Sequence, residues 1–263
     1  MKAGKKDQRP VVLSIAGYDP SSGAGITADI KTIAAHGCYG VTCITALTVQ
    51  STQGVRSVVP VSGKVIAATL NELAGDFEIA AVKIGMLASA GAAKAVAAFL
   101  KRHRFNMVVL DPVLVSSSGA RLLSRDGVRV LKEKLLTLTQ FITPNIDEAA
   151  ALSGLHVRDA ADVSAAAGRL HKLGARNVII TGGHLNPPTD FFSMDFGART
   201  KGFTGKKIAT RSTHGTGCAF STALACNLAA GHDLVQATAA ARAYVRVALQ
   251  KAAPLGKGFG PVV

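Results

Sequence analysis

The chain has 263 residues, and its 48% hydrophobic and 17% charged residues exclude a disordered protein. Lys and Arg number 30 against 16 Asp and Glu, so the formal net charge is +14 and would attract phosphorylated ligands. Trp is absent and no aromatic residues interleave with the basic clusters, so we expect no nucleic-acid partner.

The N-terminal region carries no targeting pattern. Residues 1–10 form a polar, basic tail, and the apolar run that follows at 11–16 is too short for a signal peptide or a membrane span. No CxxC pair occurs among the four cysteines, which are Cys38, Cys43, Cys218 and Cys226. We therefore expect reduced thiols, a cytoplasmic location and no membrane partner.

Short apolar runs alternate with helical segments along most of the chain. In chain order we expect strand 11–16, helix 26–35, strand 41–49, helix 65–74, strand 80–84, helix 92–102, strand 107–110, helix 128–136, strand 141–143, helix 160–173, strand 177–181, a β-hairpin region at 190–210, and helices 218–230 and 234–252. This order predicts a single α/β domain over residues 1–263, with a mostly parallel central sheet and helices on both faces.

Polar or glycine-rich loops follow the predicted strands. They lie at residues 17–25, 50–52, 85–86, 111–119, 143–148 and 181–184. In a doubly wound parallel sheet such loops gather at one edge, where ligands bind. We therefore expect the functional residues among them.

The sequence Thr213-His214-Gly215-Thr216-Gly217-Cys218 runs directly into a predicted helix. A helix start has unpaired amides and partial positive charge, and glycines allow a close approach, so the pattern favours an anion site. The same field would lower the pKa of the Cys218 thiol toward neutrality. The structural alternative is a glycine turn that caps an ordinary core helix.

Two nucleotide-binding patterns are excluded or weakened. Gly23-x-Gly25-x-x-Ala28 matches the dinucleotide fingerprint, but no Asp or Glu stands between Asp29 and Glu72 to bind the ribose. A GxxxxGK[ST] P-loop is absent, so an ATP site must be of another kind.

Asp111 opens the loop after an apolar strand, and Glu148 follows Asn145 by three residues. Mg²⁺ in phosphate chemistry takes one or two carboxylates together with substrate phosphates, which favours a magnesium site here. The structural alternative is a capping box, in which Asn145 caps a helix and Glu148 returns the hydrogen bond.

Eight ordered blocks, spread over nearly the whole chain, resemble the hydroxymethylpyrimidine/phosphomethylpyrimidine kinases of thiamine synthesis, members of the ribokinase-like superfamily. The blocks are Ala16-Gly17-x-Asp19-Pro20-Ser21-x-Gly23-Ala24-Gly25-Ile26-x-Ala28-Asp29, Ile44-Thr45-Ala46-Leu47-Thr48-Val49-Gln50-x-Thr52-x-Gly54-Val55, Lys83-Ile84-Gly85-Met86-Leu87, Asp111-Pro112-Val113, Thr143-Pro144-Asn145-x-x-Glu148-Ala149, Gly182-Gly183-His184, residues 213–218, and Gly258-Phe259-Gly260-Pro261-Val262.

The resemblance implies a ribokinase-like fold and phosphorylation of the hydroxymethyl group of a small pyrimidine, then of its monophosphate, with ATP and Mg²⁺. It implies an anion hole at Gly215, Thr216 and Gly217, with Cys218 as the base where many superfamily members have Asp. It places the pyrimidine at Gly17, Asp29, Gln50, Met86 and Val113. It places the nucleotide and Mg²⁺ at Asp111, Asn145, Glu148 and Thr181, with Asp111 and Glu148 as the metal ligands. A homodimer is also expected.

The chain departs from this family at two positions, where Ser117 and Thr181 stand in place of lysines expected near phosphate. Arg121 or a lysine of the 201–207 region would compensate. Two other functions stay open: a pyridoxal-type kinase, and a non-catalytic pyrimidine- or nucleotide-binding regulator descended from the kinases. The missing lysines favour the regulator, whereas the intact 215–218 turn, Asp111 and Glu148 favour a kinase.

Overall fold

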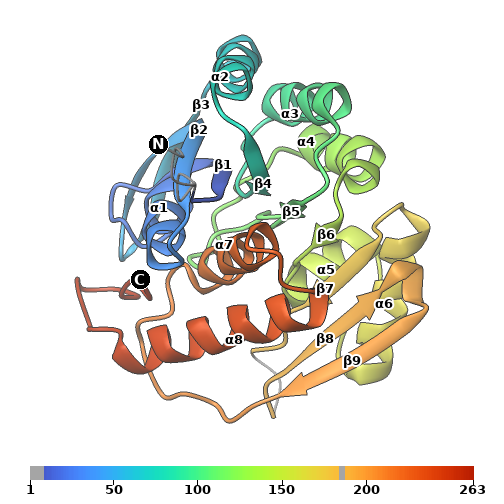
Figure 1. Ribbon diagram of the computed structural model, residues 1–263. Coiled ribbons are helices and arrows are strands. Elements are labelled where there is room, and N and C mark those ends of the chain that lie inside the picture. Colours follow the sequence, from blue (N-terminus) through green and yellow to red (C-terminus); the bar gives the residue numbers. More distant parts are fainter. Residues whose placement is uncertain (1–8, 184–186) are drawn as a thin grey trace, which may run out of the picture.

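A nine-stranded sheet forms the centre of the computed structural model, which describes residues 9–183 and 187–263 (Figure 1). The strand order is β3-β2-β1-β4-β5-β6-β7-β8-β9. The strands are β1 (Val11–Tyr18), β2 (Tyr39–Ser51), β3 (Gly54–Pro60), β4 (Ile79–Ile84), β5 (Val108–Leu110), β6 (Phe141–Ile142), β7 (Asn177–Ile180), β8 (Thr189–Met194) and β9 (Arg199–Thr204). The six strands from β2 to β7 in this order are parallel, and β3, β8 and β9 pair antiparallel at the two edges.

In the described part of the chain, eight α-helices connect or follow the strands: α1 (Gly25–Ala35), α2 (Gly63–Asp76), α3 (Ala90–His103), α4 (Arg125–Val130), α5 (Ile146–Ser153), α6 (Ala160–Lys172), α7 (Thr216–Ala229) and α8 (Leu234–Lys251). Several begin where a side chain accepts a hydrogen bond from the first turn, as Ser62 does for α2 and Ser89 for α3. None of the helices among the described residues is long and apolar enough to cross a membrane.

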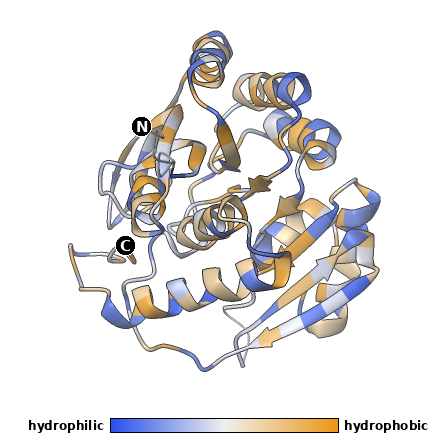
Figure 2. Ribbon diagram, in the orientation of Figure 1, coloured by the Kyte–Doolittle hydropathy of each residue, from blue (hydrophilic) through white to orange (hydrophobic). Residues whose placement is uncertain are grey.

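The helices cover both faces of the sheet, as the continuous burial of the central strands requires. In β4, Val82 and Ile84 pack into a core with α2, α3, α5 and α6, whereas Ala81 packs into a second core with α1, α7 and α8. Figure 2 shows the central strands as mainly hydrophobic, with hydrophilic residues spread over the outer hairpin and α8. The predicted α/β class with a mostly parallel sheet is confirmed.

Two segments differ from the prediction. Strand β3 was not expected, because Gly54–Pro60 mixes exposed polar residues with valines and forms only the antiparallel edge of the sheet. The helix expected over 128–136 is a short α4 followed by a π-helical turn, Leu131–Leu135, and a 3-10 turn, Leu136–Leu138. The expected hairpin is confirmed as β8 and β9 around a short 3-10 turn, Asp195–Gly197.

The loops at the carboxyl ends of the parallel strands lie at one edge of the sheet. Backbone hydrogen bonds join them in series, because the amide of Gly85 donates to Ile15, that of Asp111 to Ile84 and that of Thr143 to Leu110. His184, which the sequence placed in one of these loops, and residues 1–8 of the predicted tail lie outside the described residues.

Candidate active site

A buried ion pair lies beneath this edge. Lys83 Nζ is 2.9 Å from both carboxylate oxygens of Asp29, and both side chains are 0% exposed. Two hydroxyl groups also donate to Asp29, Ser14 Oγ at 2.6 Å and Thr222 Oγ1 at 2.8 Å. The pair therefore joins four elements, β1, α1, β4 and α7, at one point under the site.

The ion pair determines the charge of Lys83. Burial alone would lower the pKa of Lys83, but the charge and hydrogen bonds of Asp29, together with the nearby Asp111 and Cys218, outweigh burial and the pKa is raised. Asp29 has no exposed surface, and its oxygens accept from Ser14, Lys83 and Thr222. We expected Asp29 to contact the pyrimidine, but its carboxylate is enclosed by protein groups and has no surface exposed to a ligand.

The predicted anion turn lies at the start of α7. Gly215 precedes the helix with φ +84, which disfavours any other residue, and a Cβ there would collide with the Gly23 carbonyl. The helix start leaves the amides of Gly217 and Cys218 without an intrahelical acceptor, and no acidic side chain occupies the first turn. Two glycine loops thus meet closely around an uncapped helix N-terminus, as a phosphate site requires.

The low pKa expected of Cys218 is wrong. The residue is half-buried, but the surroundings of its sulfur are buried, and this burial raises the pKa of the thiol to about 12. The charge of Lys83 and the amide of Gly25 oppose the rise, while Asp111 adds to it. Burial therefore outweighs the favourable field of the helix start, and the thiol is protonated at neutral pH.

Asp111 and Glu148 are two buried carboxyl groups beside the anion turn. Both are almost fully buried, and burial together with the charge of Asp111 raises the pKa of Glu148 to about 8. Burial also raises the pKa of Asp111, although Lys83 and a hydrogen bond from Ser221 Oγ (3.1 Å) oppose it. A Cβ on Gly217 would lie 3.8 Å from Asp111 Oδ2, which places this carboxylate directly under the anion turn.

This donor set fits Mg²⁺ brought by a nucleotide. Each oxygen of Glu148 accepts one backbone amide, from Leu114 (3.4 Å) and Asn145 (3.0 Å), and keeps a further lone pair. No group of three His, Cys, Asp or Glu gathers within residues 9–183 and 187–263, so the protein alone does not complete a metal cage. Mg²⁺ commonly binds through one or two carboxylates, with substrate phosphates and water completing its shell.

The capping box expected as the structural alternative at Asn145 and Glu148 is also confirmed. Asn145 Oδ1 accepts from the Glu148 amide at 2.8 Å, and Glu148 accepts from the Asn145 amide, which forms a full capping box on α5. Thr181 lies beside Asn145 in a parallel bridge, and its amide donates to Pro144. The capping box therefore holds Glu148 near Asp111, so the two interpretations are compatible.

Three of the expected pyrimidine contacts gather on the other side of the turn. Gly17 lies against Met86, because a Cβ at Gly17 would be 2.8 Å from the Met86 sulfur. Met86 packs in a small apolar cluster with Ala46, and Val113 packs against this cluster. Two valines of the unexpected strand β3, Val55 and Val58, pack there too.

Gln50 lies half-buried near the end of β2, next to the anion turn. Its side-chain amide is 3.1 Å from His214 Nε2, and His214 Nε2 is 2.7 Å from Asp19 Oδ2. The structure therefore brings Gln50 to the site and adds His214 and Asp19, two residues without a predicted role.

The loop that lacks the family lysine passes over β3. Ser117 is exposed, and the neighbouring Ser118 Oγ accepts from the Val55 amide at 3.4 Å. Arg121 pairs with Val115 in an antiparallel bridge at the base of the same loop. Among the lysines expected to compensate, Lys201 stacks its ammonium over the Phe203 ring, 5.1 Å from the centroid.

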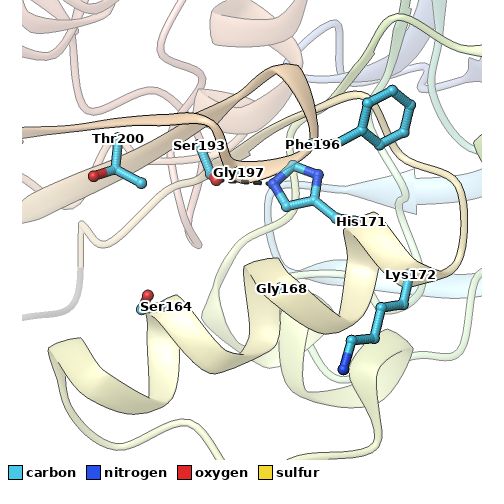
Figure 3. A pocket seen from close by; sticks show the side chains of 8 residues that line it. All are labelled: Ser164, Gly168, His171, Lys172, Ser193, Phe196, Gly197 and Thr200. Carbon is cyan, nitrogen blue, oxygen red and sulfur yellow. Dashed lines mark hydrogen bonds between the residues drawn. The ribbon is translucent and has the colours of Figure 1, made fainter.

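A separate hollow of about 480 Å³ lies between α6 and the β8–β9 hairpin (Figure 3). His171 lines it, but Nδ1 faces the Ala175 carbonyl at 2.7 Å and Nε2 faces Ser193 Oγ at 2.8 Å. Both ring nitrogens are thus engaged by the protein, and none of the predicted site residues lines the hollow. We do not assign the chemistry to it.

One residue of the sequence, Lys83, does indicate the ion pair. Lys83 interrupts an apolar strand, Ile79–Ile84, and a lysine on a strand buried on both faces requires an anionic partner. His214 and Asp19 lie 195 positions apart, and neither residue alone indicates a partner.

Known proteins resemble this chain closely. Residues 19–263 match the phosphomethylpyrimidine kinase family. The bifunctional thiamine biosynthesis protein ThiED of Geobacter sulfurreducens is 44% identical over 97% of this chain, and the match spans 52% of that relative, about half its length. Hydroxymethylpyrimidine/phosphomethylpyrimidine kinase of Haemophilus influenzae is 43% identical, over 95% of this chain and 94% of that protein.

A solved structure shows the same fold. The pyridoxal kinase of Bacillus subtilis, determined as an ADP complex, superposes with a TM-score of 0.88 at 32% identity and covers 97% of this chain and 96% of that one. The resemblance found in the sequence and the ribokinase-like architecture are therefore confirmed. The chain belongs to the phosphomethylpyrimidine kinase family.

Proposed function

We propose that the chain transfers phosphate from ATP to the hydroxymethyl group of 4-amino-5-hydroxymethyl-2-methylpyrimidine, and then to the resulting monophosphate, in thiamine biosynthesis. Membership of the phosphomethylpyrimidine kinase family over residues 19–263 carries this conclusion. The uncapped turn at Gly215 beside Asp111 and Glu148 supports it, because phosphoryl transfer needs an anion site next to a magnesium site.

The residues have separate roles in this proposal. The amides at the start of α7 stabilise charge on the transferred phosphoryl group. Asp111 and Glu148 would hold Mg²⁺, which would neutralise part of the charge of the nucleotide phosphates. Asn145 holds Glu148 in place through the capping box, and Thr181 lies beside it.

We assign the pyrimidine to the space between the anion turn and β3. Gly17 gives a close approach, and Met86 and Val113 offer apolar contact to the ring faces. The amide of Gln50 both donates and accepts, which suits the ring nitrogen and amino group of an aminopyrimidine. Asp29 acts from below by fixing Lys83 and α7, without touching the ring.

Cys218 remains the candidate proton acceptor, but the burial of its sulfur restricts the protonation state in which it can act. The thiol has a pKa of about 12, so it is neutral when substrates bind. A phosphoryl transfer with a loose transition state needs little help from a base until late in the reaction. Because the neutral thiol already carries its proton, Cys218 can accept the hydroxyl proton only in its thiolate form, and otherwise the proton passes to an oxygen of the phosphoryl group as the new P–O bond forms.

The chain lacks two family lysines that are expected near phosphate, and without their positive charge we expect weaker binding of phosphate. Lys206 and Lys207 are exposed and follow β9, and Arg246 donates to the Lys206 carbonyl at 2.9 Å. This contact ties the basic segment to α8, which follows the helix of the anion turn. We propose that this segment supplies part of the positive charge that Ser117 and Thr181 do not.

A pyridoxal-type kinase is the second candidate, favoured by the likeness to the Bacillus subtilis enzyme. A non-catalytic regulator is the third, and the paired carboxylates and the uncapped turn argue against it. We also propose a cytoplasmic location, where ATP is available. The four cysteines are free thiols, which fits a reducing compartment. We propose that residues 1–263 act as a single kinase domain.

Product analysis tests the function directly. We expect incubation with hydroxymethylpyrimidine, ATP and Mg²⁺ to give the pyrimidine monophosphate and then the diphosphate, resolved by mass spectrometry. Parallel incubation with pyridoxal should give much less product. Phosphorylation of pyridoxal alone would establish the second candidate, and no phosphorylation of either ring would establish the regulator.

Alkylation tests the state of Cys218. Only the thiolate reacts, so a thiol with a pKa of about 12 should be alkylated by iodoacetamide at a rate that rises about tenfold per pH unit between pH 7 and 10. Peptide mapping by mass spectrometry follows Cys218 separately from the buried Cys38, Cys43 and Cys226. A plateau of the Cys218 rate below pH 9 would show that the helix field outweighs burial.

The homodimer expected for the family has a candidate surface on the sheet edge. Tyr18, Leu47 and Val59 lie side by side across β1, β2 and β3 and are 36%, 49% and 58% exposed. We expect light scattering to give the mass of a dimer, and the Leu47→Asp/Val59→Asp variant to give that of a monomer. A wild-type protein that is monomeric at micromolar concentration would refute this proposal.

A further inference from the structure

The imidazole of His214 lies where three segments of the site meet. Its Nε2 atom is 2.7 Å from Asp19 Oδ2 in the loop after β1 and 3.1 Å from the Gln50 amide on β2. Its ring packs so closely on Gly23 that a Cβ there would collide with it. His214 also immediately precedes Gly215 of the anion turn.

The backbone of His214 is fixed as well. Its amide donates to the Gly260 carbonyl at 3.0 Å, and its carbonyl accepts from the Val262 amide at 3.0 Å. The C-terminal segment therefore fixes the backbone that carries the ring, and only 13% of the side chain is exposed. A ring held in this way presents Nε2 to its neighbours in one direction.

Asp19 decides which atom carries the hydrogen. Burial raises the pKa of Asp19, but hydrogen bonds from His214 and Ser21 outweigh it, so the net pKa is lowered and the carboxylate is ionised at neutral pH. A carboxylate only accepts, so the Nε2 atom of His214 must donate to it. An Nε2 atom that carries a hydrogen has no lone pair for the Gln50 amide nitrogen that faces it at 3.1 Å, so the amide is better placed when it is turned with its oxygen toward His214.

The contacts of Thr48 favour the same orientation of the Gln50 amide. Its hydroxyl donates its single hydrogen to the Tyr18 carbonyl at 2.9 Å. The Gln50 amide oxygen lies 3.2 Å from Thr48 Oγ1, which has no second hydrogen to give it, so this contact is satisfied when the amide is turned and its nitrogen donates to Thr48. The orientation of an amide is assigned from its partners, and both partners of Gln50 require the oxygen toward His214 and the nitrogen toward Thr48.

We propose that His214 is a positioning residue that fixes the orientation of the Gln50 amide and so determines which ring the site accepts. With this orientation, Gln50 keeps one N–H and one oxygen lone pair for the ligand, in a set order. An aminopyrimidine edge matches that order in only one way, because its ring nitrogen only accepts and its amino group donates. A hydroxyl group both donates and accepts, so a hydroxypyridine ring tolerates either order.

This inference rests on the proposed pyrimidine kinase activity and adds a cause for its ring preference. Without the donor at residue 214, the Gln50 amide is free to turn over. We expect His214→Leu to raise the KM for hydroxymethylpyrimidine roughly tenfold, as the loss of one buried hydrogen-bond pairing predicts. The KM for ATP and the inhibition constant of pyridoxine, a hydroxypyridine, should change less than threefold.

Two further variants separate positioning from general damage. His214→Gln places a side-chain N–H donor near the position of Nε2 and should restore most of the pyrimidine affinity. His171→Leu is the matched control, because His171 is also a half-buried histidine with both nitrogens engaged, and it lines a hollow that contains none of the site residues (Figure 3). It should leave all three constants unchanged, and thermal unfolding reports whether each variant folds.

The outcomes divide clearly. A selective rise in the pyrimidine KM for His214→Leu, reversed by His214→Gln, supports the inference. An unchanged pyrimidine KM, or an equal loss for pyrimidine, pyridoxine and ATP, overturns it, since the second result is that of a purely structural residue. Failure of the wild-type protein to phosphorylate hydroxymethylpyrimidine would instead refute the proposed function.

Discussion

The ion pair between Asp29 and Lys83 is the contact on which the geometry of the site depends. It lies wholly inside the protein, and Ser14 and Thr222 complete its hydrogen bonds. Charges in such surroundings are costly unless they are paired and fully hydrogen-bonded, so removing one partner typically costs about 3–5 kcal/mol. Because its members come from β1, α1, β4 and α7, the pair fixes α7, and with it the anion turn, against the sheet.

Above this pair, two loops pack closely against each other because glycines stand at their contact points. Gly23 and Gly215 approach so closely that a side chain on either would collide with the other loop. His214 and Asp19 then fasten the two loops together. The close approach brings the phosphate turn next to Gln50, so recognition of the ring and stabilisation of phosphate charge share one rigid support.

Periodicity was sufficient to predict most of the fold. The buried parallel strands are short, apolar and followed by polar loops, so their alternation with helices predicted the doubly wound sheet. Strand β3 was missed because an edge strand such as Gly54–Pro60, with its mixed exposure, lacks that pattern. Its absence from the prediction also hid Val55 and Val58, which pack at the proposed ring site.

The chemistry was harder to predict than the fold. Motif residues such as Gly215, Asp111 and Glu148 were found by their order along the chain, and the structure brings them to one edge. The state of Cys218 was not predictable, because burial of its sulfur depends on residues far apart in sequence and outweighs the local helix field. The enclosed position of Asp29 likewise depends on Lys83, 54 positions away, although a lysine in an apolar strand was itself a signal.

A double-mutant cycle on Asp29 and Lys83 tests the role of the ion pair most directly. Denaturant unfolding and pyrimidine binding are measured for Asp29→Asn, Lys83→Gln and the double variant, which replaces the charges with a neutral amide pair. The buried pair predicts that each single variant is destabilised, that the double variant is more stable than the sum of the two losses by roughly 0.5–3 kcal/mol, and that it still binds pyrimidine within a few-fold of wild type. Additive losses of stability would contradict the coupling of the pair, and a stable double variant that no longer binds pyrimidine would show instead that Asp29 contacts the substrate itself.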